Sequence, residues 1–215
     1  MGQFINLLNA KVKYYDGPVR ALDPTFGKDY FDGSRNTGFG GYRYIPGWWD
    51  ATIDSLTAHY DIKDGISLLD LGCAKGFFLA DFRKRFPNSH LHGIDISAYA
   101  IDNADPSVKD CVHIGDCSDL SGFEDNSFDL VTGMNVIHFL PPDQAEKALS
   151  EIQRISKGHS FVQVDSFHNE LEKERMLAWA PTIKTLCSPT GWREMFQRAG
   201  YLGDYWWTIM KQTAE

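Results

Sequence analysis

From residue 66 onward the chain alternates between short apolar runs and longer amphipathic stretches. The apolar runs predict five buried strands, at residues 66–71, 91–94, 111–114, 128–132 and 160–164. Stretches with helical periodicity lie between these runs. This alternation is typical of parallel strands joined by right-handed crossovers. The pattern therefore predicts an α/β fold with a doubly wound, mostly parallel sheet.

Helices are expected in the intervals, at residues 76–86, 97–104 and 141–155. In the first of them Phe78, Phe82 and Phe86 recur four residues apart and form one apolar face. The last third predicts a helix at 169–178, a strand at 181–186, a helix at 190–199 and a final strand at 205–210. We expect these strands to complete a seven-stranded sheet with one antiparallel member.

The first strand leads into a turn rich in glycine. Gly72 and Gly76 follow the acid Asp70, and an amphipathic helix pattern begins directly after them. Glycine lets the backbone turn sharply and approach a ligand that a Cβ would contact. The dinucleotide pattern Gly-x-Gly-x-x-Gly is absent, because positions 74 and 77 hold Ala74 and Phe77. Gly-Lys-Ser/Thr, the end of a phosphate loop, is absent as well.

Acidic residues follow the strands at the edge of the sheet where such folds bind ligands. Asp95 ends the second strand and can accept two ribose hydroxyls; its alternative role is a helix cap. Asp116 follows the third strand, and its alternative role is to form a turn. Asp70 is either a direct ligand or a buried acid that organises the glycine turn.

The segment Asp70, Gly72, Ala74, Gly76 resembles motif I of the class I S-adenosylmethionine-dependent methyltransferases. The resemblance implies a Rossmann-like sheet of that type, with S-adenosylmethionine as cofactor and the acids facing its amino group, ribose and adenine. Because this cofactor has no pyrophosphate, no phosphate cradle is needed. The residues expected to bind it are Asp70, Gly72, Cys73, Ala74, Gly76, Asp95, Ile96, Asp116, Cys117 and Asn135.

Residues 127–140 resemble motif IV of the same family, which places Asn135 near the transferable methyl group. His138 in this segment is a candidate acid–base residue or a hydrogen-bonded core residue. Asp165 and His168 follow the fifth strand and are further catalytic candidates; alternatively they are a strand-end acid and a helix-start residue. No acid follows the fourth strand, so we predict no metal site.

Residues 1–60 lie outside the predicted cofactor domain, which we place at 61–215. Residues 28–49 are dense in glycine, aromatic and arginine side chains. Such residues provide bends, contact area and anion contacts, so we expect a lid that completes the acceptor pocket. An arm packed across the sheet edge is the alternative. The expected acceptor-binding residues are Asp32, Arg35, Tyr42, Arg43 and Tyr44.

The composition of the chain limits the classes of partner that we expect it to bind. The formal net charge of −8 argues against nucleic acid, although one local basic pocket would be compatible with it. No apolar run is long enough to cross a membrane, and no secretion signal precedes the fold. The four cysteines show no CxxC or zinc spacing, which favours reduced thiols and a cytoplasmic protein. We expect a monomer or a homodimer.

The resemblance to these methyltransferases implies methyl transfer to an oxygen or nitrogen atom of a small, possibly anionic acceptor, such as a sugar, a nucleotide-sugar or a phosphorylated metabolite. The N-terminal segment, with residues 203–208, also resembles bacterial small-molecule methyltransferases associated with capsule and surface-glycan modification. Two alternatives are a module that binds the cofactor without turnover and an NAD-type oxidoreductase, which the glycine pattern disfavours.

Overall fold

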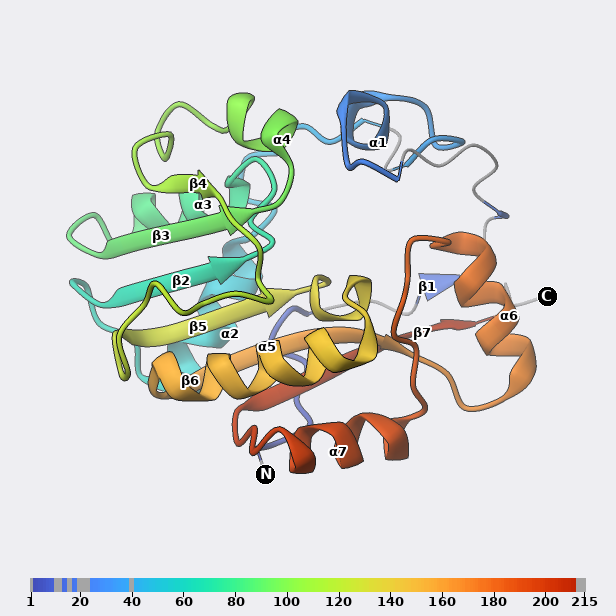
Figure 1. The fold of residues 1–215 in the computed structure, drawn as a ribbon. Coiled ribbons are helices and arrows are strands. Elements are labelled where there is room, and N and C mark those ends of the chain that lie inside the picture. The colour runs from blue at the N-terminus through green and yellow to red at the C-terminus, as the bar shows by residue number, and fades with distance from the viewer. Residues whose placement is uncertain (1, 10–12, 15–16, 19–23, 39–40, 212–215) are drawn as a thin grey trace.

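The computed structural model describes residues 2–9, 13–14, 17–18, 24–38 and 41–211. One twisted sheet lies between two layers of helices (Figure 1). Its six main strands are β2 (Ser67–Leu71), β3 (His90–Asp95), β4 (Val112–Ile114), β5 (Phe128–Met134), β6 (Ser156–Ser166) and β7 (Asp204–Lys211). They run in the order β4-β3-β2-β5-β6-β7, and the two-residue β1 (Lys13–Tyr14) extends the sheet beyond β7.

Every strand pair of the described sheet is parallel, including β6 with β7 and β7 with β1. The prediction of an antiparallel member is therefore wrong. The predicted strand at 181–186 does not form, and the nearest ladder contact is an isolated bridge between Ser166 and Cys187. The remaining predicted strands are confirmed, with ends shifted by a few residues.

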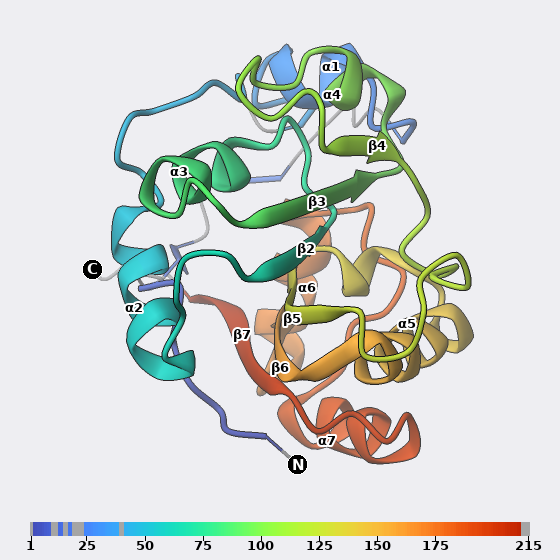
Figure 2. The same ribbon diagram turned by 90° about the vertical axis from the view of Figure 1, so that its left-hand side faces the viewer.

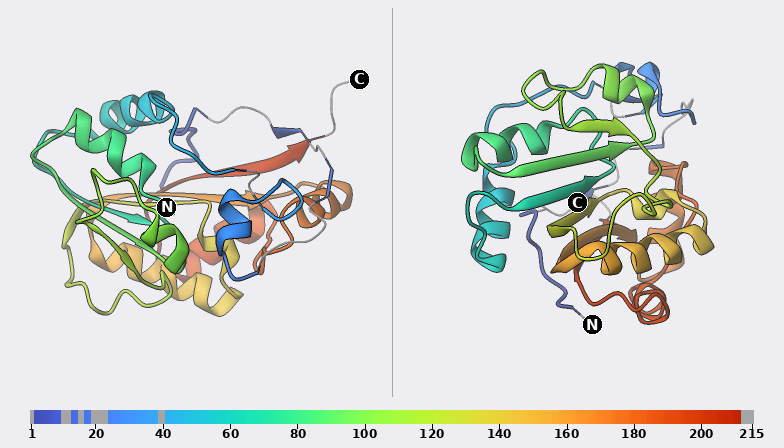
Figure 3. Two further views of the ribbon diagram at one scale, coloured as in Figure 1. Left: turned by 90° about the horizontal axis from the view of Figure 1, so that it is seen from above. Right: turned by 60° about the vertical axis from the view of Figure 1, so that its left-hand side comes forward.

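Helices cover both faces of the sheet. Seen from above (Figure 3), α2 (Asp50–Tyr60) and α3 (Phe77–Arg85) lie on one face, and α5 (Pro142–Ile155) and α7 (Pro189–Arg198) on the other. The remaining helix of the C-terminal part, α6 (Glu170–Trp179), lies by the β7 edge. The short helices α1 (Lys28–Asp32) and α4 (Ala98–Asp102) lie side by side, where the chain leaves β3 (Figure 2).

The core has one large apolar cluster on each side of the sheet, as strands buried on both faces require. On the α3 side Leu68, Phe78 and Phe82 are fully or almost fully buried. On the α5 side Leu69 and Leu149 are fully buried. This packing fixes the carboxyl ends of β2, β3 and β5 at one edge, where the predicted acids emerge.

All four cysteines are free thiols, and three of them are buried. Among the described residues, no helix combines the length and the apolar character needed to cross a membrane.

Candidate cofactor and acceptor site

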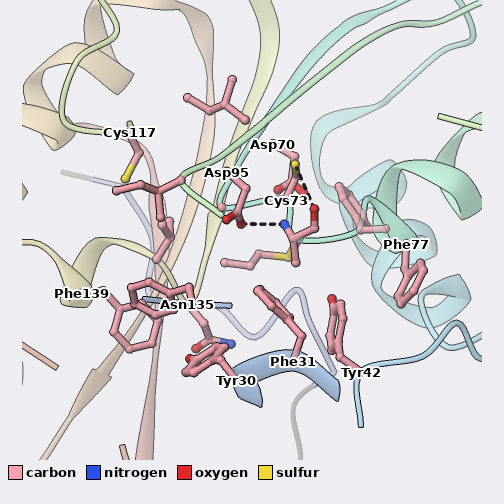
Figure 4. A pocket seen from close by; sticks show the side chains of 18 of the residues that line it. Tyr30, Phe31, Tyr42, Asp70, Cys73, Phe77, Asp95, Cys117, Asn135 and Phe139 are labelled. Carbon is pink, nitrogen blue, oxygen red and sulfur yellow. Dashed lines mark hydrogen bonds between the residues drawn. The ribbon is translucent and has the colours of Figure 1, made fainter. Parts of the chain in front are cut away.

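A cavity of about 720 Å³ lies at the carboxyl ends of β2, β3, β4 and β5. Figure 4 shows two sets of side chains around it: Asp70, Cys73 and Asp95 from the strand ends, and Tyr30, Phe31 and Tyr42 from the N-terminal segment. The sheet thus supplies the polar part of the lining and the N-terminal segment supplies much of the aromatic part.

The glycine turn has the left-handed backbone that its sequence requires. Gly72, Ala74 and Gly76 have φ angles of +69°, +50° and +72°. A Cβ at Gly72 would come within 2.7 Å of the Val136 side chain, and one at Gly76 within 2.8 Å of Val108. The glycines are therefore needed for packing against protein. Gly72 lines the cavity and Gly76 does not, so contact between Gly72 and a ligand stays a prediction.

The Asp95 carboxylate lines the cavity and is held by two backbone donors. Its Oδ2 accepts from the Ala74 amide at 2.8 Å and its Oδ1 from the Ser97 amide at 2.8 Å. Ser97 itself caps α4, because its side chain accepts from the Ala100 amide. Asp95 therefore orders the turn while its carboxylate faces the cavity, and burial raises its pKa.

Asp70 is the buried acid of the site. Its side chain is 3% exposed, and its Oδ1 accepts from the Thr132 hydroxyl at 2.8 Å. Burial raises the pKa of Asp70 to about 7, since the charged form is separated from water and Thr132 offsets only part of that cost. The group lines the cavity and can change its charge near neutral pH.

The other predicted strand-end residues also lie on the cavity, except Gly76. Asp116 lines it and also accepts from the Ser118 amide at 2.8 Å, so its turn-forming role coexists with access to a ligand. Burial raises the pKa of the neighbouring Cys117 to about 12, which keeps that thiol protonated. Asn135 has a φ of +58°, and its amide donates to the Gln163 carbonyl. Cys73, Ala74 and Ile96 complete this set.

The predicted acceptor residues separate into three places. Tyr42 and Arg43 line the main cavity, and Arg35 lines a smaller one beside it. Asp32 lines neither cavity, because both its carboxylate oxygens accept from the Lys75 ammonium at 2.7 Å. Tyr44 points to α3 and donates to Asp81, also away from both cavities.

The predicted catalytic residues also lie in different places in the structure. His138 and Asp165 are almost fully buried and line the smaller cavity, with His138 Nε2 3.4 Å from Asp165 Oδ2. Burial lowers the pKa of His138 despite the neighbouring Asp165. His168 is exposed and pairs with Glu172 in the first turn of α6. His168 lines neither cavity. Its position therefore supports the alternative role, that of a helix-start residue.

The charge of the main cavity limits its ligand. Asp70, Asp95 and Asp116 place three carboxyl groups at the strand ends. Arg43 and Lys184 are the only cationic side chains among the described lining residues, and both are exposed. Such a site disfavours a pyrophosphate and suits a ligand with hydroxyls and positive charge.

Residues 68–159 match the family model described as a methyltransferase domain. This part of the chain is a class I methyltransferase domain. The domain uses S-adenosylmethionine as its cofactor. Its cavity fits that molecule, because S-adenosylmethionine carries a sulfonium and an ammonium group, two ribose hydroxyls and no phosphate. Asp70, Asp95 and Asp116 line the cavity and would be the carboxyl groups that face these groups.

Two curated relatives match most of this chain. An uncharacterized protein of Haemophilus influenzae is 26% identical over 171 residues, covering 74% of this chain and 67% of its own length. Phosphoethanolamine N-methyltransferase 2 of Caenorhabditis elegans is 29% identical over 171 residues, covering 72% of this chain. The match spans only 38% of the length of the worm enzyme.

Solved structures show the same fold. A SAM-dependent methyltransferase of Archaeoglobus fulgidus superposes with a TM-score of 0.54 at 20% identity, covering 80% of this chain and 72% of its own. The YcgJ protein of Bacillus subtilis superposes with a TM-score of 0.56 at 18% identity, covering 68% and 66%. At these identities the likeness concerns the fold alone.

Asp95→Ala is expected to weaken binding of S-adenosylhomocysteine by about 10- to 100-fold, because charge-assisted bonds to two hydroxyls are lost. Titration calorimetry measures the change. Ser97→Ala is the matched control, since it removes the α4 cap and leaves the carboxylate in place. Equal loss in both variants would assign the effect of Asp95 to the helix start.

Binding of S-adenosylhomocysteine is expected to depend on pH through Asp70. The folded carboxyl has a pKa of about 7, so protons compete with the ligand ammonium below that pH. Affinity should therefore rise with pH, by about tenfold between pH 5.5 and pH 8. Asp70→Asn should bind weakly at both values. A steep pH dependence that persists in Asp70→Asn would place the titrating group elsewhere.

Proposed function

We propose that the protein transfers the methyl group of S-adenosylmethionine to an oxygen or nitrogen atom of a small molecule. One observation carries this proposal: the main cavity continues from the strand-end carboxylates into an aromatic region. Tyr30, Phe31 and Tyr42 lie there opposite Asp70 and Asp95. This enclosed aromatic region suits a small acceptor better than a polymer.

The N-terminal segment acts as the lid of this region. Its α1 is attached to the glycine turn, because the Lys75 ammonium binds the Asp32 carboxylate at 2.7 Å and the Tyr42 carbonyl at 3.1 Å. Tyr42 also stacks on Phe77 at the start of α3, with ring centroids 5.1 Å apart. These contacts hold the segment against the glycine turn and α3, and opening of the lid would break them.

His138 and Asp165 are the candidates for proton removal from the acceptor. Methyl transfer needs positioning, exclusion of water and loss of one proton, which passes to a base. When bound, S-adenosylmethionine supplies an electrophilic methyl group. Burial lowers the pKa of His138, so its ring is neutral near pH 7, and its Nδ1 accepts from the Asp165 amide at 3.2 Å. Its Nε2 therefore carries the ring proton and faces the Asp165 carboxylate at 3.4 Å, so the proton of the acceptor would pass to that carboxylate, with His138 orienting it.

A direct assay can identify the chemical class of the acceptor. The name of the Caenorhabditis elegans relative, phosphoethanolamine N-methyltransferase, adds phosphorylated amines to the candidate sugars and nucleotide-sugars. Each compound is incubated with S-adenosylmethionine, and S-adenosylhomocysteine is measured. Formation of product with a small acceptor supports the proposal. Tight retention of radiolabelled cofactor with no product across the panel would favour a binding module instead.

Arg43→Ala is expected to raise the acceptor KM about tenfold and to leave S-adenosylhomocysteine affinity unchanged. Arg43 is an exposed member of the cavity lining, on the lid side, so its loss removes an acceptor contact but no core packing. Steady-state kinetics and a melting curve measure both effects. A lowered melting temperature with unchanged kinetics would indicate that the lid has only a structural role.

A further inference from the structure

Gln163 is a buried polar side chain of the main cavity that lies outside the sequence motifs described above. It belongs to β6, lines the cavity and is 3% exposed. In the parallel ladder it lies in register with Met134 of β5 and Trp206 of β7, so the three side chains point to the same face of the sheet. Both neighbours pack against the apolar cluster on the α3 side. The Gln163 amide therefore interrupts an apolar row.

One end of the Gln163 amide is held by the protein, and the other end is open. Its Nε2 donates to the Thr208 hydroxyl at 2.6 Å. Among the described residues its Oε1 has no hydrogen-bond partner, and this oxygen is not one of the side-chain atoms that are sealed from solvent without a partner. Because the residue lines the cavity, the oxygen opens onto it. A carbonyl in such a position requires a donor, since leaving it without one is costly.

The other side chains on this side of the cavity are apolar and aromatic. Trp49 and Phe78 line the cavity with ring centroids 5.4 Å apart, and both pack in the same apolar cluster as the strand neighbours of Gln163. Ile45 and Trp48 line the same cavity and are 44% and 67% exposed. Large apolar side chains left exposed at a cavity favour a ligand that covers them with an apolar surface of its own.

We propose that Gln163 selects the methyl acceptor: its amide oxygen accepts a hydrogen bond from a hydroxyl or N–H group of an acceptor whose neutral, planar ring packs against Trp48 and Trp49. This inference rests on the proposed function, since it names the acceptor class of the same site. A phosphate dianion has no proton to donate to the Gln163 carbonyl, whereas a phenol or an aromatic amine supplies both the donor and the ring. Thr208 is then a positioning residue, which fixes the orientation of the amide.

The test compares two probes, 4-methylphenol and its methyl ether, on the full chain saturated with S-adenosylhomocysteine. The probes share one ring, and only the phenol donates a hydrogen bond. Ligand-observed NMR titration of the unaltered protein should give about fivefold tighter binding of the phenol than of the ether. Gln163→Met keeps the length of the side chain and removes the carbonyl, so this preference should disappear. Thr208→Val releases the amide and should reduce the preference.

Gln144→Met is the matched control. Gln144 lines the same cavity from α5 and is exposed, so this variant removes a second amide of the lining and should keep the preference for the phenol. The affinity for S-adenosylhomocysteine should be the same in Gln163→Met, Gln144→Met and the unaltered protein. That measurement also shows that each variant is folded.

The outcomes separate the role of Gln163 from the enzyme activity. Absence of phenol binding, equal affinity for the two probes, or a preference that persists in Gln163→Met would overturn the proposal. A loss of S-adenosylhomocysteine affinity in Gln163→Met at an unchanged melting temperature would also overturn it, because the amide would then hold the cofactor. A preference for the phenol that depends on Gln163, in a protein that methylates no acceptor, would support this role and contradict the proposed function.

Discussion

Gly72→Val is expected to lower the free energy of unfolding by about 2 to 5 kcal/mol. A Cβ at this position would lie 2.7 Å from the Cβ and Cγ2 of Val136, so the core must shift, which costs about 1–3 kcal/mol. The backbone φ of +69° adds the strain of a branched residue in the left-handed region, about 1–2 kcal/mol. Cofactor binding should fail because the turn no longer forms. Urea unfolding, followed by circular dichroism, measures the loss.

Gly200→Val separates the two contributions. Gly200 has a φ of +67°, almost the same as Gly72, but a Cβ there meets nothing within 4 Å. The free energy of unfolding of this variant should fall only by the cost of the backbone strain, about 1–2 kcal/mol. If Gly72→Val is no less stable than Gly200→Val and fails only to bind S-adenosylhomocysteine, then the glycine does contact the ligand, as the sequence first indicated.

Asp32→Ala is expected to destabilise the protein by about 3 kcal/mol, since it leaves a buried ammonium without its carboxylate. The Lys75 side chain is 7% exposed and its ammonium binds both oxygens of Asp32. After the substitution, the described contacts that remain for the Lys75 ammonium are the Tyr42 carbonyl and the face of the Tyr99 ring, 5.6 Å away. The melting temperature and urea midpoint should both fall, and α1 should become more accessible to proteases.

Two comparisons test the cause of this effect. Asp29→Ala removes an exposed carboxylate from the same helix and should change stability by less than about 0.5 kcal/mol. Adding Lys75→Met to Asp32→Ala removes the unpaired charge and should recover part of the loss. If the double variant is less stable than Asp32→Ala, the ammonium is not the source of the destabilisation.

The regular part of the fold could be predicted because its strands are buried on both faces. Such strands appear in the sequence as short apolar runs, as residues 66–71 and 128–132 do. The acids that follow them could also be predicted, since a residue at the end of a parallel strand must lie at the ligand-binding edge. Asp70, Asp95 and Asp116 accordingly reach one cavity.

The incorrect prediction of a strand at residues 181–186 has a local cause. Ile183 is buried with Met176 and Met210, so an apolar residue there packs beneath α6 and β7 without belonging to the sheet. The amides of Lys184 and Thr185 both donate to the His138 carbonyl, and no ladder forms. With that strand absent, α6 and α7 form a helical crossover from β6 to β7. A crossover of this kind places β7 parallel, which alternation of side chains alone could not reveal.

The acceptor side was harder to predict, because its residues come from segments that only the fold brings together. Asp32 has the residue type of a cation-pairing or ligand-binding group, and the sequence contains no sign that its partner is Lys75. Lys13 and Trp179 belong to no motif, yet they line one cavity with Arg35. Asp165 lies within β6, whereas His168 follows it, and the chain turns outward after Ser166 and leaves His168 exposed.

The position of β1 has a consequence for the order of folding. Lys13 pairs in register with Met210, so almost the whole sequence lies between the two partners. During synthesis β7 emerges long after β1. Pairing two strands that lie so far apart in the sequence closes a very long loop, which carries a high cost in chain entropy. The cofactor half of the site can be complete before β7 exists. The contribution of Lys13 to the lining of the smaller cavity can form only afterwards, so that cavity is expected to be completed last on the folding pathway.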